Sequence, residues 1–318
     1  SDLWSRTERS QYLPAGTRES KGGKAYYREN ISSKLVNENL LTYNKIFNKI
    51  HSLNAVVAGT WEINKSTNRT NEASGFLNDY LQDDAMQTAN ETPIINNGRA
   101  KSTMASWLGR VNYTLNNKYL FTVSYRADGS SKFAQNNKWA YFPSGAVAWR
   151  ASEEGFIKDL NIFSNLKIRA SYGETGNQAI STYGSMTRMG AVKYANDGQL
   201  VTGVGINPDG LGNNNLTWET TKQTDLGIDL GFFNNRLNLI VDVYRKSTHD
   251  LLQQQEIPLS LGYTKRWINM GELRNEGLEI TLSGTPVAGR FTWNSDFNIS
   301  FNRNKVISLG DGIPSQTV

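Results

Sequence analysis

Apolar and polar side chains alternate with a period of two from about residue 34 to residue 304. Such alternation is typical of β-strands that present one apolar and one polar face. In the clearest segment, 291–302, one face carries Phe291, Trp293, Ser295, Phe297, Ile299 and Phe301. The pattern recurs in roughly ten segments, many of them longer than the usual strand of about 5–6 residues. The sequence therefore predicts an all-β, antiparallel fold of long strands.

The connections between the expected strands differ in length on the two sides of the sheet. The tight turns on one side are 47–50, 116–118, 233–235 and 288–289. The longer connections on the other side, rich in Asn, Gly and Asp, are 65–102, 129–138, 176–216 and 251–274. One further connection, 152–163, carries Ser152 ahead of two glutamates, which predicts a compact helix with Ser152 as its N-cap.

Alternation alone fits both a soluble sandwich, with its apolar face inward, and a membrane barrel, with its apolar face outward. The apolar faces of the segments between Leu53 and Phe301 carry no charged residue. A lipid-facing surface must lack charged residues in this way, because a Lys or Arg facing lipid at the bilayer midplane costs about 2–4 kcal/mol. The strands reach the roughly 9–11 residues that a tilted strand needs to cross hydrocarbon. These features favour an antiparallel transmembrane β-barrel segment.

The opposite faces of the same segments are rich in Asn, Thr, Ser and Gly and carry ions of both signs. The ionic residues are Arg110, Arg126, Arg150, Lys167, Arg169, Asp229, Asp242, Glu279 and Asp296. A water-filled or plugged lumen suits this mixture. We expect Arg126, Arg150 and Arg169 to face the lumen, where they would pair with carboxylates of a plug or meet a ligand.

Composition excludes several other classes. The chain has no Cys and only two His, His51 and His249, so thiolate chemistry and His-rich metal sites are excluded. No nucleophile stands at a recognisable spacing from His249, and Asp79, Asp83 and Asp84 lack the spacing of a calcium loop. The basic residues are scattered, so no nucleic-acid partner is predicted. We expect no enzyme activity, no cofactor and no metal site.

Four ordered blocks of the sequence resemble the SusC/RagA family of TonB-dependent outer-membrane transporters. They are 124–133 with 141–144 and 148–150; 166–177; 218–223 running to 244–246; and 271–279. The first reads Ser-Tyr-Arg-Ala-Asp-Gly-Ser-Ser-Lys-Phe, and the last reads Gly-Glu-Leu-Arg-Asn-Glu-Gly-Leu-Glu. Weaker similarity covers 35–61.

The resemblance implies a location in the outer membrane and a plugged barrel of about 22 strands. It also implies TonB-energised import of oligosaccharides or peptides, together with a SusD-like surface lipoprotein. Residues 1–318 are then expected to be part of a single barrel domain. The sequence departs from the complete pattern, since it has no signal peptide, TonB box or plug. It also ends at Gln316-Thr317-Val318, without the aromatic residue of a terminal strand.

Ligand contacts are expected in the long loops, where aromatic rings stand among many Asn, Gln and Asp. The candidates are Tyr80, Tyr183, Tyr194, Tyr263 and Trp267. The same rings also suit contacts between loops or with the lipoprotein. Two alternative functions remain open from the sequence: a soluble β-sandwich or adhesin-like binding module, and a siderophore or cobalamin receptor of the TonB-dependent class.

Overall fold

The computed structural model describes residues 2–14, 23–207 and 209–310. The chain forms two compact units, one of residues 1–38 and 60–105 and the other of residues 39–59 and 106–318. We refer to these as unit 1 and unit 2. From the sequence, we noted that the chain ends without a terminal aromatic residue. The residues concerned, Gln316, Thr317 and Val318, lie outside the described residues.

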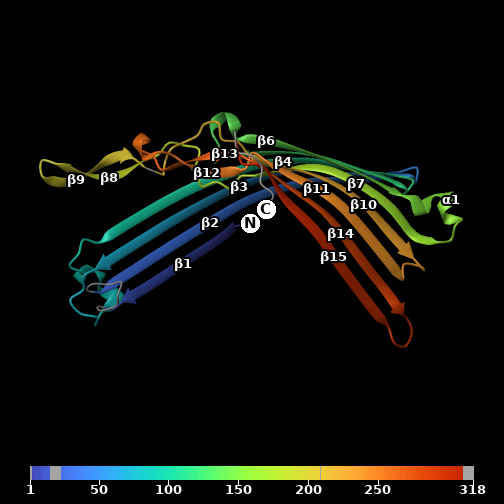
Figure 1. The fold of residues 1–318 in the computed structure, drawn as a ribbon, viewed down its shortest axis with the longest axis horizontal. Coiled ribbons are helices and arrows are strands. Elements are labelled where there is room, and N and C mark those ends of the chain that lie inside the picture. The colour runs from blue at the N-terminus through green and yellow to red at the C-terminus, as the bar shows by residue number, and fades with distance from the viewer. Residues whose placement is uncertain (1, 15–22, 208, 311–318) are drawn as a thin grey trace. The chain divides into compact units, whose positions relative to one another are not determined.

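Eleven strands form the main sheet, in an order that follows the chain (Figure 1). They are β1 (Asp2–Leu13), β2 (Lys24–Phe47), β3 (His51–Ser74), β4 (Ile94–Leu115), β5 (Tyr119–Ser130), β6 (Trp139–Arg150), β7 (Phe163–Asn177), β10 (Glu219–Phe232), β11 (Leu237–His249), β14 (Glu272–Val287) and β15 (Trp293–Ser308). The paired strands from β5 to β15 are antiparallel. The all-β, antiparallel prediction is confirmed.

The sequence underestimated the strands near the N-terminus. β1 lies outside the ten expected segments, and half of the expected loop 65–102 is strand, because β3 extends to Ser74 and β4 begins at Ile94. Between Lys65 and Glu72 the chain has no apolar residue, so there is no apolar face for a period-two pattern to reveal. The remaining connection, 75–93, contains the 3₁₀-helix η1 (Gln82–Thr88).

Two of the expected loops contain hairpins. β8 (Met189–Asn196) pairs with β9 (Gln199–Ile206), and β12 (Leu252–Glu256) pairs with β13 (Lys265–Asn269). Asp197 and Gly198 join β8 to β9, both with positive φ, as a tight hairpin turn requires. Figure 1 labels both hairpins in the long connections.

Three of the four tight turns form as predicted, while the connection expected at 288–289 is longer, 288–292, because β14 ends at Val287 and β15 begins at Trp293. Asn116 and Asn117 both have positive φ, as do Asn234 and Asn235, which is the conformation that Asn tolerates better than most residues. The prediction for 152–163 was partly wrong. A 3₁₀-helix (η3, Ala151–Glu153) precedes the single turn of α1 (Gly155–Lys158), whose N-cap is Glu154 and not Ser152.

Two short 3₁₀-helices, η2 (Gln135–Asn137) and η4 (Leu259–Leu261), complete the helical elements of the described residues. No helix in the described ranges combines the length and the hydropathy that a membrane-spanning helix needs.

Unit 1 has a small core of its own. Ala25, Ala73 and Phe76 are buried, and Tyr12 packs edge-on against Phe76 with ring centroids 5.5 Å apart. In the same unit, the nearly fully buried carboxylate of Glu29 pairs with the guanidinium groups of Arg6 on β1 and Arg69 on β3. Charge pairing therefore compensates the burial of Glu29.

Candidate lipid-facing and ligand-facing surfaces

One face of the unit 2 sheet carries a continuous row of apolar residues across seven strands. Phe121, Val147, Ala170, Leu226, Val243, Leu278 and Phe301 are paired in register from β5 to β15. The neighbouring row, two residues closer to the tight turns, is also apolar from Tyr119 and Trp149 to Ile299. We call this side of the sheet the apolar face.

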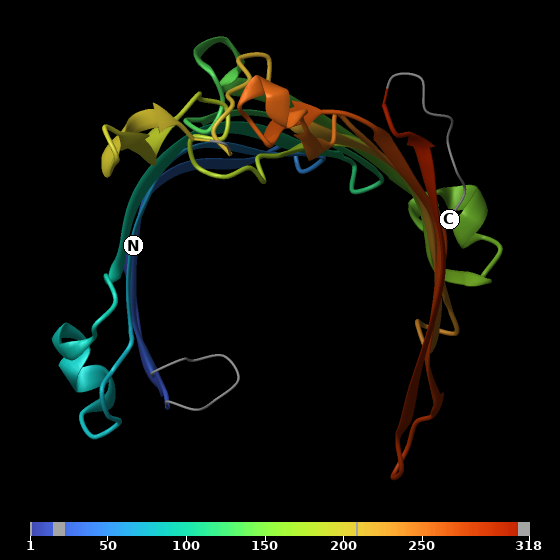
Figure 2. The ribbon, with the colours of Figure 1, turned by 60° about the vertical axis from the view of Figure 1, so that its left-hand side comes forward.

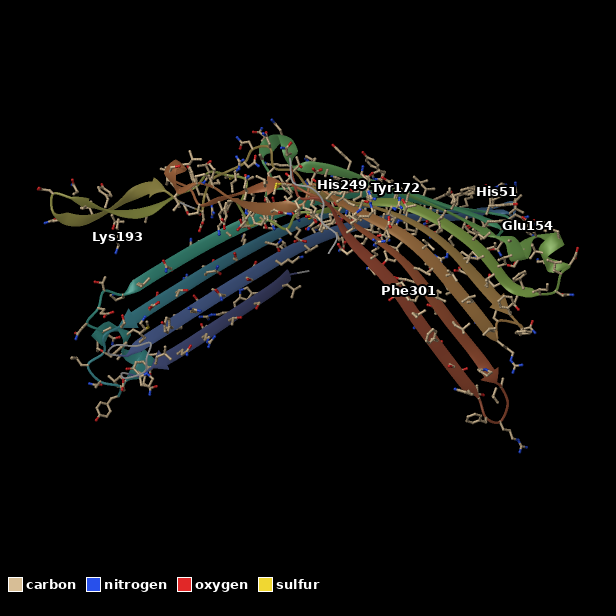
Figure 3. All side chains as sticks on the ribbon, viewed as in Figure 1. His51, Glu154, Tyr172, Lys193, His249 and Phe301 are labelled. Carbon is tan, nitrogen blue, oxygen red and sulfur yellow. The ribbon has the colours of Figure 1, made fainter. Side chains whose placement is uncertain are left out.

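The apolar face is exposed. Phe121 is 43% exposed, Val123 64% and Phe297 57%, although all three belong to residue types that a soluble protein buries. In a sandwich these side chains would be packed against a second sheet. The soluble sandwich is therefore wrong for this chain, and the face has the character of a lipid-facing surface. Figure 3 labels Phe301 on β15 of this sheet.

The opposite, polar face carries an ionic network in the middle of the strands. The Arg169 guanidinium lies 2.8 Å from the Asp229 carboxylate on β10 and 2.9 Å from that of Asp242 on β11. Lys167 adds a longer contact of 3.5 Å to Asp229. Gly227 makes room for the crossing, because a Cβ there would lie 2.7 Å from the Arg169 Cζ.

The other two expected lumen-facing arginines also lie on the polar face. Arg126 donates from Nε to both carboxylate oxygens of Asp128, each at 2.8 Å. Arg150 donates from Nη1 to the Asn117 Oδ1 at 2.5 Å. Each of the three arginines thus binds groups on its own or a neighbouring strand or turn.

A packed layer covers the end of unit 2 that carries the long connections, which we call the loop end. Phe133 and Trp218 are buried, with ring centroids 5.1 Å apart, and the Phe142 ring lies 5.9 Å from that of Trp218. The Trp218 indole N–H donates to the Lys138 carbonyl at 3.1 Å. This layer ties the connection 131–138 to the start of β10.

The two longest connections are joined to each other at the same end (Figure 2). Asn269 in β13 donates to the carbonyls of Thr217 and Asp250, and its Oδ1 accepts from the Thr217 N–H. The Asn213 side chain donates to the Trp267 carbonyl at 2.9 Å. The amide side chains therefore fix the β12–β13 hairpin over the sheet.

A polar cavity of about 730 Å³ opens beneath that hairpin. Its lining includes Asn213, Asn215, His249, Asp250, Gln255, Arg266, Asn269 and Glu272. His249 Nδ1 lies 3.6 Å from the Glu272 carboxylate, and Figure 3 labels His249 at the end of β11. The cavity offers amide, guanidinium and carboxylate groups, which suit a hydroxyl-rich or peptide ligand.

The five expected aromatic residues are divided between the two units. Tyr80 lies in unit 1, almost fully exposed, while the other four lie in unit 2. Trp267 packs close to the segment of Tyr183, since its Cδ1 lies 3.1 Å from where a Cβ would stand at Gly184. Tyr194 is exposed on the β8 strand, and Tyr263 precedes β13.

Sequence reasoning missed the cavity and its amide lining. Asn213 and Arg266 lie more than 50 residues apart, and neither stands in a periodic pattern. An isolated bridge between Leu211 and Arg266 brings their segments together. Only the abundance of Asn in these loops could have signalled a polar site.

A second polar cluster lies at the opposite end of unit 2, which we call the turn end. The Glu154 carboxylate accepts from Lys118 Nζ and from the Tyr119 hydroxyl, both at 2.7 Å, and from the Trp149 indole at 3.3 Å. These donors, with Lys118 the largest contributor, lower the pKa of Glu154 to about 2. Figure 3 labels Glu154 and His51 in this region. His51 Nδ1 lies 2.7 Å from the Tyr113 hydroxyl and contacts no catalytic partner in the described structure.

Comparison with known proteins agrees with the sheet and its two faces. The family described as "TonB dependent receptor-like, beta-barrel" matches residues 2–315. TonB-dependent receptor P3 of Formosa agariphila is 37% identical over 292 residues, covering 92% of this chain and 29% of that protein. TonB-dependent receptor SusC of Bacteroides thetaiotaomicron is 35% identical over 285 residues, covering 86% and 28%.

Among solved structures, that of the RagAB peptide transporter superposes with a TM-score of 0.86 at 26% identity, covering 98% of this chain and 34% of that one. The chain belongs to the TonB-dependent receptor-like β-barrel family. The SusC/RagA resemblance and the outer-membrane location are thus confirmed. The chain spans less than a third of the length of the curated relatives described above.

Proposed function

We propose that this chain is part of an outer-membrane importer of oligosaccharides or peptides, energised by TonB. The observation that carries the proposal is the exposed apolar row from Phe121 to Phe301, backed by a charged polar face on the same strands. The similarity to SusC and to a RagAB peptide transporter supports the two ligand classes. Import of this kind requires no covalent chemistry.

We further propose that residues 1–318 are part of one barrel domain of about 22 strands with a plug in its lumen. In that barrel the polar face lines the lumen, so Arg126, Arg150 and Arg169 face the import path. Their carboxylate partners on β5, β10 and β11 and the amide partner Asn117 in the turn 116–118 support this, because they hold the arginines against the wall and keep the path open.

A SusD-like lipoprotein is the proposed partner at the loop end. The long connections of unit 2 are built as one layer, through the Trp218 packing and the Asn269 hydrogen bonds. A rigid layer of this kind suits a lid that closes over the ligand, because a preformed surface loses less conformational entropy on docking.

The ligand contacts are proposed at the loop aromatics Tyr80, Tyr183, Tyr194, Tyr263 and Trp267. The strongest case is Trp267, since its backbone carbonyl accepts a hydrogen bond from Asn213, which lines the polar cavity. An aromatic ring stacked on a sugar or peptide group contributes about 0.5–1.5 kcal/mol, so Trp267→Ala should weaken binding roughly 2- to 10-fold. Tyr141→Ala, on the apolar face, is the matched control and should leave affinity unchanged.

The decisive experiment uses cells that produce the full-length receptor with its lipoprotein. Uptake of labelled oligosaccharides and of labelled peptides is measured with and without TonB. We expect TonB-dependent uptake of one class only. Uptake of both classes without TonB, or of a ferric siderophore in their place, would contradict the proposal.

A further inference from the structure

On β10, β11, β14 and β15 the first row beyond the apolar band of unit 2 is polar and mostly charged, whereas on β5, β6 and β7 the same row continues as Val123, Gly145 and Tyr172. Moving one row toward the loop end from Leu226, Val243 and Phe301, the paired residues are Thr224, Arg245, Glu276 and Arg303. The next row contains Lys222, Arg274 and Lys305. Because alternate residues of a strand share a face, these side chains project on the same side as the apolar face.

Cations outnumber carboxylates in these rows. Arg245 pairs with Glu276 at 2.7 Å, Lys222 lies 3.9 Å from Glu174, and Arg274 lies 3.7 Å from Glu272. Within the described part of the chain, Arg303 and Lys305 have no carboxylate within ion-pair distance. The Arg274 Nε is buried without a hydrogen-bond acceptor among the same residues. The five cations thus leave a net positive patch with unused donors.

A groove of about 620 Å³ joins the charged rows to the apolar band. Its apolar part is formed by Leu226, Val243, Leu278 and Phe301, and its polar part by Thr224, Arg245, Glu276 and Arg303. The lining therefore changes from hydrocarbon-like to cationic within one row of the sheet. Such a surface matches an amphiphile whose anionic headgroup lies next to its acyl chains.

We propose that the cationic rows and this groove bind a phosphorylated lipid of the outer leaflet. The acyl chains lie along the apolar part, while Arg303, Lys305 and Arg274 donate to the phosphate oxygens. Guanidinium groups suit this contact because their N–H donors match phosphate geometry. The assignment of the leaflet rests on the proposed function, in which the loop end faces outward.

The test uses the full-length receptor, purified in detergent and mixed with dioleoyl phosphatidic acid as a defined phosphate lipid. Lipid retention is measured by native mass spectrometry, with dioleoyl phosphatidylcholine as the zwitterionic probe. One cation near a charged lipid surface contributes about 1 kcal/mol, which is roughly 5-fold in affinity. The variant Arg303→Gln with Lys305→Gln should therefore retain phosphatidic acid about 25-fold more weakly.

Arg290→Gln is the matched control, because it removes one charge at the other end of the same β14–β15 hairpin. Arg290→Gln should leave the retention of phosphatidic acid unchanged. Arg303→Lys, which keeps the charge, should retain more phosphatidic acid than Arg303→Gln does. Equal retention by the double variant, or equal retention of the two lipids, would overturn the proposal. Competition by inorganic phosphate at the same concentration as the lipid would show a phosphate site without acyl recognition and would overturn it too.

Uptake is measured on the same variants. A receptor that retains phosphatidic acid but imports neither ligand class refutes the proposed function and leaves the lipid site standing. Unchanged import together with unchanged retention in the double variant refutes the lipid site alone.

Discussion

The two ends of unit 2 are stabilised in different ways. At the turn end, Lys118 N–H donates to the Leu115 carbonyl and Arg236 N–H to the Phe233 carbonyl, so each turn is closed by residues three apart. At the loop end, the Trp218 indole reaches Lys138, which is 80 residues away. The turn end therefore consists of turns that are each closed within themselves and joined by a few contacts such as those of Glu154 with Lys118 and Tyr119, while the loop end is one layer assembled from distant segments.

This difference predicts how each end responds to substitution. A turn at the turn end can weaken with little effect on its neighbours, because the hydrogen bond that closes it lies within the turn. The loop layer should weaken as a whole, since each of its connections depends on the others for burial and hydrogen bonding.

The largest effect is expected for Trp218→Ala. Removing a buried aromatic side chain costs about 3–5 kcal/mol, through lost burial and the cavity left against Phe133 and Phe142. Hydrogen exchange of the full-length receptor should show lost protection in both 131–138 and 178–218. Phe156→Ala in α1, where the ring is 63% exposed, is the control. Loss of protection confined to one connection would contradict a single cooperative layer.

A smaller effect is expected for Asn269→Ala, which leaves one N–H and two carbonyls of the neighbouring connections without their partner. Each such loss costs about 1–3 kcal/mol when the group stays buried. Limited proteolysis should cut 250–271 and 178–218 faster than in the wild type. Asn238→Ala, which removes one hydrogen bond to Asn235 at the turn end, should leave the proteolysis of both unchanged.

At the turn end, Asn234→Ala should destabilise its hairpin by about 1–2 kcal/mol, because an L-residue with a Cβ resists the left-handed conformation. Asn234→Gly should restore the stability, since glycine adopts positive φ freely. Hydrogen exchange of the amides around 231–238 measures both variants. If exchange at 178–218 changed as well, the two ends would not be independent.

The smallest effect is the pH dependence of Glu154. Its pKa is lowered to about 2 in the folded protein, against about 4.3 for an unperturbed glutamate. The folded state is therefore favoured by the ionised carboxylate above about pH 4.3, and this contribution is lost as the pH falls toward about 2. Carbon NMR of the labelled carboxyl group should give the lowered pKa directly.

Hydrogen exchange of the Arg150 amide, which donates to the Lys118 carbonyl, is a second measure of the stabilisation lost when Glu154 is protonated. The protection factor of this amide, which is corrected for the intrinsic pH dependence of exchange, should vary less between pH 5 and pH 2 in Glu154→Gln than in the wild type. A carboxyl pKa near the ordinary glutamate value would refute the cluster of donors around Glu154.

Strands with one apolar face could be predicted from the sequence, and the row from Phe121 to Phe301 is the best example. The Asn-containing turns could be predicted as well, because their conformation depends on the residues of the turn itself. The strand around Lys65 to Glu72 could not, since both of its faces are polar. The helix cap at Glu154 was missed because the carboxylate is held by donors from other strands.

The candidate site divides in the same way. The sequence indicated Trp267 and Arg169 by residue type, but not their partners. The polar cavity with Asn213 and Arg266, and the pairing of Arg169 with two aspartates, bring together residues from separate parts of the chain. Whether the expected arginines and loop aromatics meet a ligand stays a prediction.

The sequence by itself determined that the chain forms long antiparallel strands with one face for apolar surroundings, because alternation with period two fixes which side chains share a face. The tertiary structure decided that this face lies uncovered and that charged rows follow directly on the apolar band. It also decided that distant loops form one layer. These properties depend on the register between strands and on contacts across dozens of residues, which no local pattern encodes.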